Sequence, residues 1–209
     1  ETARQNRERE NRFQNRHKKL RRLVEEVQPL ASELRVLQEE GIDIDYQGDN
    51  LDQIIQRIET IKGEFDSEAA WIIQDENDLS DLDTWIRRHR DKVQRKLQSV
   101  WRDYYQAQVP DLSDDLLSVL RRFDDFRGAV KTIRECGKQL QKWEENPPDT
   151  KDSLSTFQEF AEERRATWEQ LRSDEMSEDV LSFLVDAGTE GATVEQLTDE
   201  VRTWLDQND

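Results

Sequence analysis

The chain has 209 residues, of which 33% are hydrophobic and 38% charged, and its formal net charge is −17. This composition is too polar for the wide core of a β-sandwich or an α/β domain, yet six Trp and seven Phe argue against disorder. Long helices that each bury one narrow stripe reconcile the two facts. We therefore expect an all-α protein: an elongated antiparallel helical bundle with a coiled-coil hairpin and a small C-terminal two-helix module.

The charge is unevenly distributed along the chain. Residues 1–22 hold nine Lys or Arg against three Glu, a local charge of +6, which leaves −23 for residues 23–209. A surface that negative repels nucleic-acid phosphates and anionic lipids. Only the basic segment 4–22 could attract phosphates, and its candidate contact residues are Arg4, Arg7, Arg9, Arg12, Arg16, Lys18 and Lys19. The alternative for this segment is the solvated start of a coiled coil.

Cysteine content and hydropathy bear on the compartment. Cys136 is the only cysteine, so the chain has no intrachain disulfide and no Cys-based metal site. No apolar run approaches the ~18 residues of a membrane span, and no signal-peptide pattern is present. These features favour a cytoplasmic protein without membrane contact. Because residue 1 is Glu rather than Met, one expectation is that the chain is an excised part of a longer protein.

Residues 1–75 carry two heptad patterns of apolar residues, which is the signature of helices that pack along a seam. The seam residues of the first pattern are Phe13, Leu20, Val27 and Leu34, with Leu23, Leu30 and Leu37 beside them. Those of the second are Leu51, Ile58, Phe65 and Ile72, with Ile54 and Ile61 beside them. Gly41 and Gly48 lie in the breaker between the two patterns, so we predict helices over about 13–40 and 50–74 that pair antiparallel. In this pairing Leu23 lies near residues 61–65.

Residues 76–172 continue the helical bundle. We predict helices over about 80–108, 113–145 and 153–172. The first stops at Val109-Pro110 and the second before Asn146-Pro147-Pro148, because proline cannot continue a helix and restricts the residue before it. Ser113 is suited to cap the second helix.

Residues 173–209 form the predicted two-helix module. Ser177 is suited to cap its first helix, and Thr193-Val-Glu-Gln196 has the form of a capping box that opens its second. Two short helices joined in this way resemble the opening of a helix-turn-helix. Residues 177–209 carry nine acids against Arg202 alone, however, which opposes DNA reading. Docking of a protein and packing on the bundle remain as roles, and the candidate partner-binding residues are Trp168, Phe183, Trp204 and Leu205.

Few residues suggest catalytic chemistry. The pairs Glu159-x-x-Glu162 and Glu175-x-x-Glu178 are similar in spacing to those with which helical nucleotide pyrophosphatases hold Mg²⁺, but the second pair straddles a predicted break. Neither His17 nor His89 follows a Glu by three residues, which excludes the di-iron bundle motif. We expect His89 to be a partly buried histidine with a hydrogen-bond partner. No phosphate-binding loop or nucleophile motif is present, so we assign no catalytic residue, cofactor or metal.

The leading functional hypothesis is a non-enzymatic helical scaffold or adaptor that works through protein–protein contacts. It would be a subunit or an excised arm of a larger assembly, such as a large ATPase or a multi-subunit complex. An alternative is a nucleic-acid-associated subunit that uses the basic segment 4–22. A third is a metal-dependent nucleotide hydrolase that uses Glu159, Glu162, Glu175 and Glu178.

Overall fold

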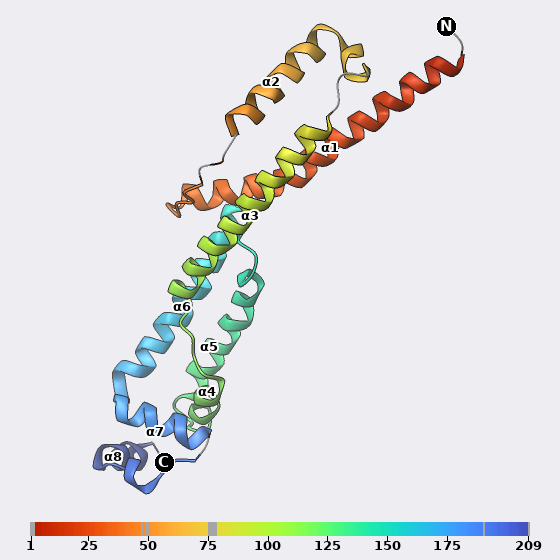
Figure 1. Cartoon of the computed structure of the whole chain (residues 1–209). Coiled ribbons are helices and arrows are strands. Elements are labelled where there is room, and N and C mark those ends of the chain that lie inside the picture. Colours follow the sequence, from red (N-terminus) through yellow and green to blue (C-terminus); the bar gives the residue numbers. More distant parts are fainter. Residues whose placement is uncertain (1–2, 47, 49–50, 75–78, 190, 209) are drawn as a thin grey trace. The chain divides into compact units, whose positions relative to one another are not determined.

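The computed structural model describes residues 3–46, 48, 51–74, 79–189 and 191–208, and within these ranges the protein is helical without strands (Figure 1). The all-α class is therefore confirmed. Contacts divide the chain into two compact units, Glu1–Val100 and Trp101–Asp209, which we call unit 1 and unit 2. The three segments expected from the sequence, 1–75, 76–172 and 173–209, stay a prediction about which parts fold independently.

Unit 1 contains α1 (Ala3–Glu39), α2 (Leu51–Ser67), a 3₁₀ helix η1 (Ala69–Ile73) and the first part of α3 (Ser80–Gln108). Within this unit α1 and α2 run in opposite directions (Figure 1). The coiled-coil packing of this pair stays a prediction. One buried apolar cluster joins α2, η1 and the start of α3, and it consists of Ile54, Ile61, Ile72, Leu79 and Leu82. Helix α1 adds further buried residues, which are Leu23, Leu30, Val36 and Leu37.

Two polar contacts hold α1 and its following loop to the rest of unit 1. Arg16 of α1 donates to the carbonyl oxygens of Ile72 and Gln74, at the end of η1. The Tyr46 hydroxyl lies 2.8 Å from Nδ1 of His89 on α3, and Gly48 lies so close that a Cβ there would be 2.9 Å from the His89 ring. His89 is therefore partly buried and hydrogen bonded, as predicted.

Unit 2 contains the end of α3 and five further α-helices: α4 (Asp114–Leu120), α5 (Arg127–Leu140), α6 (Lys151–Glu175), α7 (Glu178–Gly188) and α8 (Asp199–Gln207). Two 3₁₀ helices, η2 (Gln141–Trp143) and η3 (Val194–Gln196), complete it. Side chains of Ser113, Thr150, Ser177 and Thr198 accept a hydrogen bond from the amide three residues on, so four of the α-helices begin at a capped turn.

Helices α5 and α6 pack most extensively in unit 2 and lie side by side (Figure 1). Small residues at their contact, Cys136 on α5 and Ala161 on α6, are buried and allow a close approach. At the end of α3, Trp101 is fully buried against Phe157 of α6, and its indole nitrogen donates to the Trp143 carbonyl oxygen at 2.5 Å. Aromatic side chains thus fill one end of this core.

A second aromatic group holds the C-terminal helices to α4 and α5. The Trp204 ring of α8 stacks on Phe126 with centroids 5.8 Å apart, and meets Phe123 edge-on at 5.1 Å. Helix α7 packs on α4, where a Cβ at Gly188 would lie 2.7 Å from the Val119 side chain. The C-terminal segment is therefore part of the main core of unit 2.

Three predicted helix boundaries are wrong. The helix expected over 113–145 is interrupted at residues 121–126, which turn so that Phe123 and Phe126 both reach Trp204. The helix expected to reach residue 74 ends at Ser67, after which η1 turns Ile72 into the core. The last helix begins at Asp199 rather than near residue 194, because the predicted capping box closes only η3.

We expect Trp204→Ala to lower the free energy of unfolding by about 3–5 kcal/mol, since it removes a large side chain that is only 4% exposed. The matched control is Val194→Ala, at an apolar residue of the same segment that is 84% exposed, which should change the free energy by less than ~0.5 kcal/mol. Urea unfolding followed by circular dichroism measures both. Equal midpoints for the two variants would contradict a structural role for the Trp204 ring.

Candidate functional site: an apolar groove in unit 1

An open apolar groove runs between α1 and α2 in unit 1. It consists of two adjoining cavities of about 360 and 460 Å³, which share Leu23, Val24, Ile58 and Ile86 in their linings. Helix α1 forms one wall, α2 forms the other, and Ile86 and Leu82 of α3 contribute to the floor. As expected from the sequence, Leu23 and the 61–65 region lie on the same cavity.

The groove gathers most of the large hydrophobic side chains that are exposed in the described part of the chain. Among the described residues eight large hydrophobic side chains are exposed, and six of them line this groove. The most exposed of the six is Val24, at 62%. The others are Phe13, Leu51, Ile55, Ile58 and Phe65. A contiguous apolar surface of this kind is typical of an interaction site, whereas isolated exposed hydrophobic residues need no explanation.

Heptad spacing places apolar residues of α1 and α2 along the groove. Phe13, Leu20 and Val27 recur every seven residues on α1, and Leu51, Ile58 and Phe65 do so on α2. Residues seven apart lie on the same face of a helix. Each helix buries the neighbouring row instead, which includes Leu23 and Leu30 on α1 and Ile54 and Ile61 on α2. Of the seam rows, Phe13 on α1 and Leu51, Ile58 and Phe65 on α2 remain exposed along the groove, while Leu20 and Val27 are half-buried.

The residues that follow the two seams differ in charge, while Lys62 of α2 lines the groove itself. The residues that directly follow the α2 seam are all acidic and exposed, and they are Asp52, Glu59 and Asp66. The residues that directly follow the α1 seam are exposed and neutral or basic, and they are Gln14, Arg21, Gln28 and Arg35. We call these rows the acidic lip and the basic lip. Successive residues of a helix are about 100° apart around its axis. Each lip therefore lies on one side of its seam, and the buried row of that helix lies on the other side.

A half-buried carboxylate on the other side of α1 fixes the wall of the groove. Glu26 accepts hydrogen bonds from Arg87 and Arg90 of α3, at 2.7 and 2.6 Å, and from Arg22 of its own helix at 2.9 Å. Partial desolvation tends to raise the pKa of Glu26, but the bonds from Arg22 and Arg87 outweigh it and hold the pKa below the ordinary value of 4.5. The ionised carboxylate thus ties α1 to α3.

The structure places the four residues predicted to bind a partner in the core of unit 2. Trp204 is buried, while Trp168, Phe183 and Leu205 are partly buried and pack against the same core. Their role in binding a partner stays a prediction. Sequence periodicity did not identify the groove, although one signal was present: Val24 and Ile55 lie directly after Leu23 and Ile54 and widen the apolar stripe of each helix.

The residues of the basic segment lie on α1 and are mostly exposed. Arg4 forms an ion pair with Glu8 at 3.0 Å, and Lys19 donates to Ser80 at 3.4 Å. Arg16 is the exception, because its guanidinium is partly buried and bonded to backbone carbonyls of unit 1. Contact with phosphates stays a prediction for this segment, whose remaining members are Arg7, Arg9, Arg12 and Lys18.

The acids considered for a metal whose side chains are described each contact a residue close to them along the chain. Glu162 bonds to Arg165, and Glu178 lies 3.8 Å from Arg172. Glu159 accepts from Ser155 at 3.5 Å, and the side chain of Glu175 lies outside the described part. Among the described residues, no three His, Cys, Asp or Glu side chains form a group that could hold a metal ion.

None of the described helices combines the length and apolar composition needed to cross a lipid bilayer. Comparison with family models, curated proteins and solved structures finds no significant match to the chain. Inference about function therefore depends on the geometry of the chain itself.

We expect Glu26→Gln to lower the stability of the protein at about pH 7, because it removes the charge that Arg87 and Arg90 contact. A carboxyl whose folded-state pKa is lowered stabilises the fold above its ordinary pKa, and this contribution is lost as the pH falls through the folded-state value. The difference in urea midpoint between wild type and variant should therefore shrink at about pH 3.

Glu25→Gln is the matched control for this experiment. Glu25 is exposed and forms its ion pair with Arg21 on the same helix, so its loss should change the midpoint little at either pH. A midpoint difference for Glu26→Gln that stays constant with pH would contradict the role of the ionised carboxylate.

Proposed function

We propose that the chain is a non-enzymatic docking module that binds one amphipathic helix of a partner protein in the groove between α1 and α2. The observation that carries this proposal is the concentration of six of the eight exposed large hydrophobic side chains on one groove. Binding of an amphipathic helix in an apolar groove is a recurrent mode of peptide recognition. It suits a scaffold or adaptor within a larger assembly.

The shape of the groove supports a helix as the occupant. Two antiparallel helices on a floor provided by a third leave the fourth position of a helical bundle open. An entering helix could place apolar residues at heptad spacing against both seams, because the seams themselves have that spacing. An extended strand would lack a sheet edge to pair with, since the described part contains no strand.

The acidic and basic lips predict which charges the two flanks of the partner helix carry. The acidic lip of Asp52, Glu59 and Asp66 favours Lys or Arg on the flank of the entering helix that faces α2. The basic lip, with Arg21 and Arg35, favours Glu or Gln on the opposite flank. The partner of the proposal is therefore a helix with an apolar seam, one basic flank and one acidic or neutral flank.

The test uses fluorescent helical peptides of three heptads, with Leu and Ile along the seam. The probe peptide carries Lys on one flank and Glu on the other, and the comparison peptide carries Glu on both. We expect the probe to bind about tenfold more tightly, because three exposed ion pairs contribute roughly 0.3–0.5 kcal/mol each. Fluorescence anisotropy with the full chain measures both affinities.

Two sets of variants test whether the probe binds in the groove and whether the acidic lip determines its charge preference. Val24→Glu and Ile58→Glu should each weaken probe binding at least tenfold, whereas Val194→Glu, at an exposed valine of unit 2, should leave it unchanged. Changing Asp52, Glu59 and Asp66 together to Lys should abolish the preference for the probe. The same charge change at the exposed acids Asp125, Glu145 and Glu169 of unit 2 is its control.

Two outcomes would contradict the proposal. One is probe binding that Val24→Glu and Ile58→Glu leave unchanged. The other is a wild-type dimer that Val24→Glu converts to a monomer in analytical ultracentrifugation, since a second copy of the chain would then occupy the groove.

A further inference from the structure

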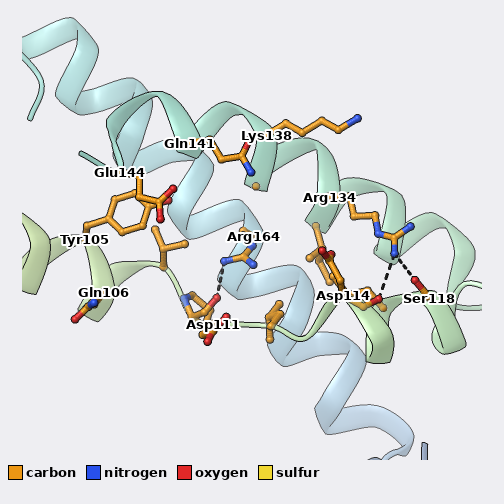
Figure 2. Close-up of a pocket in the computed structure, with 16 residues that line it drawn as sticks. Tyr105, Gln106, Asp111, Asp114, Ser118, Arg134, Lys138, Gln141, Glu144 and Arg164 are labelled. Carbon is orange, nitrogen blue, oxygen red and sulfur yellow. Dashed lines mark hydrogen bonds between the residues drawn. The ribbon is translucent and has the colours of Figure 1, made fainter. Parts of the chain in front are cut away.

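Unit 2 contains a separate polar cleft of about 1010 Å³. Its walls come from the end of α3, the segment 109–113, α4, α5 and α6 (Figure 2). Arg134 and Lys138 of α5 and Arg164 of α6 are its three cationic residues. Arg134 donates to Ser118 at 2.8 Å and to the Asp114 carbonyl oxygen at 3.4 Å, so it is already held within the wall.

Arg164 is the unusual member of the cleft. One terminal nitrogen of its guanidinium donates to the Pro110 carbonyl oxygen at 2.5 Å, as Figure 2 shows. Its Nε is buried and has no hydrogen-bond acceptor in the described part, and the acceptor of the terminal nitrogen is a backbone oxygen rather than an acidic side chain. By contrast, the half-buried Arg87 and Arg90 of unit 1 share the carboxylate of Glu26. A partly buried cation without a carboxylate is unexpected in a chain with 48 acids and 31 bases.

The surroundings of Arg164 leave its charge only partly compensated. Burial lowers the pKa of Arg164, while the nearby groups Tyr105 and Asp111 act in the opposite direction from a distance. Gly137 of α5 faces the guanidinium, and a Cβ there would be 3.8 Å from Nε. The residue of α5 that lies beside Nε is therefore a glycine, which offers no acidic side chain to the guanidinium.

We propose that this cleft binds a small organic carboxylate, which pairs with the guanidinium of Arg164 and rests its apolar body on Val109 and Leu112. A carboxylate matches the planar fork of a guanidinium and forms charge-assisted hydrogen bonds with it. Val109 and Leu112 are half-buried residues of the cleft lining and supply the apolar contact. The cleft volume of about 1010 Å³ is at the upper limit of small-molecule sites, which range over about 300–1,000 Å³.

The acids of the cleft favour a single negative charge over a phosphate. Asp111, Asp114 and Glu144 line the cleft and are exposed, and Figure 2 shows Glu144 beside the Tyr105 ring. A phosphate, with nearly two negative charges at neutral pH, would be repelled by them more strongly than a carboxylate. This discrimination distinguishes the carboxylate site from a general anion site.

The test titrates the full ¹⁵N-labelled chain with sodium benzoate, with benzamide, which has nearly the same shape without the charge, and with inorganic phosphate. The Nε–H signal of Arg164 is identified by its loss in Arg164→Lys. We expect benzoate to shift this signal and the Gly137 amide signal in a saturable way. Benzamide and phosphate should leave both signals in place at the same concentrations.

Three variants complete the test. Arg164→Gln should weaken benzoate binding at least tenfold, measured on the Gly137 amide, and Arg164→Lys should weaken it less. Gly137→Leu fills the space beside the guanidinium and removes the glycine from a helix, so it should block benzoate without loss of thermal stability. Equal shifts with benzoate and benzamide, equal binding of phosphate, or benzoate binding unchanged in Arg164→Gln would each overturn the proposal.

Discussion

The ionised carboxylate of Glu26 determines how unit 1 presents its apolar surface. It is half-buried and receives hydrogen bonds from Arg87 and Arg90, so it joins α1 to α3 through charge rather than through an apolar seam. This contact occupies one side of α1. Another side of α1 carries the apolar residues that line the groove. Of these, Phe13 and Val24 stay exposed, while Leu20 packs against the core cluster that includes Leu82 of α3.

The two units accommodate a low apolar content differently. Unit 1 leaves part of its apolar stripe exposed, whereas unit 2 closes its core with large aromatic residues, including Trp101 with Phe157 and Trp204 with Phe126. Close packing of α5 on α6 also explains the state of Cys136, since burial raises the pKa of its thiol to about 11. That thiol is protonated at neutral pH and is a packing residue rather than a nucleophile. Arg164 stands out because it lies beside this tightly packed contact.

Sequence periodicity predicted the parts of the fold that depend on neighbouring residues. The helix over 80–108 and the caps at Ser113 and Ser177 are confirmed, since capping and proline breaks act within a few residues. The turn at residues 121–126 was missed, because Phe123 and Phe126 keep the helical spacing and their partner, Trp204, is about eighty residues away. The groove and the cleft were missed for the same reason. Periodicity indicates which apolar residues share a helix face. Only tertiary contacts determine which of these residues stay exposed and which cations lack an acidic partner.

The contacts that hold the groove open also bear on how tightly it can bind. Arg16 fixes α1 to the end of η1, and Glu26 fixes it to α3, while Ile54 and Ile61 of α2 are buried in the core of unit 1. Closing α2 onto α1 would break these contacts, so the seams are kept apart before a helix enters. A preformed site spends less of its binding free energy on reorganisation. The net charge of −17 adds a long-range attraction for basic partners, and salt weakens this attraction while leaving apolar burial largely intact. Raising the ionic strength should therefore lower the association rate, which depends on the charges. It should change the residence time much less, because the residence time depends on burial of the apolar seams.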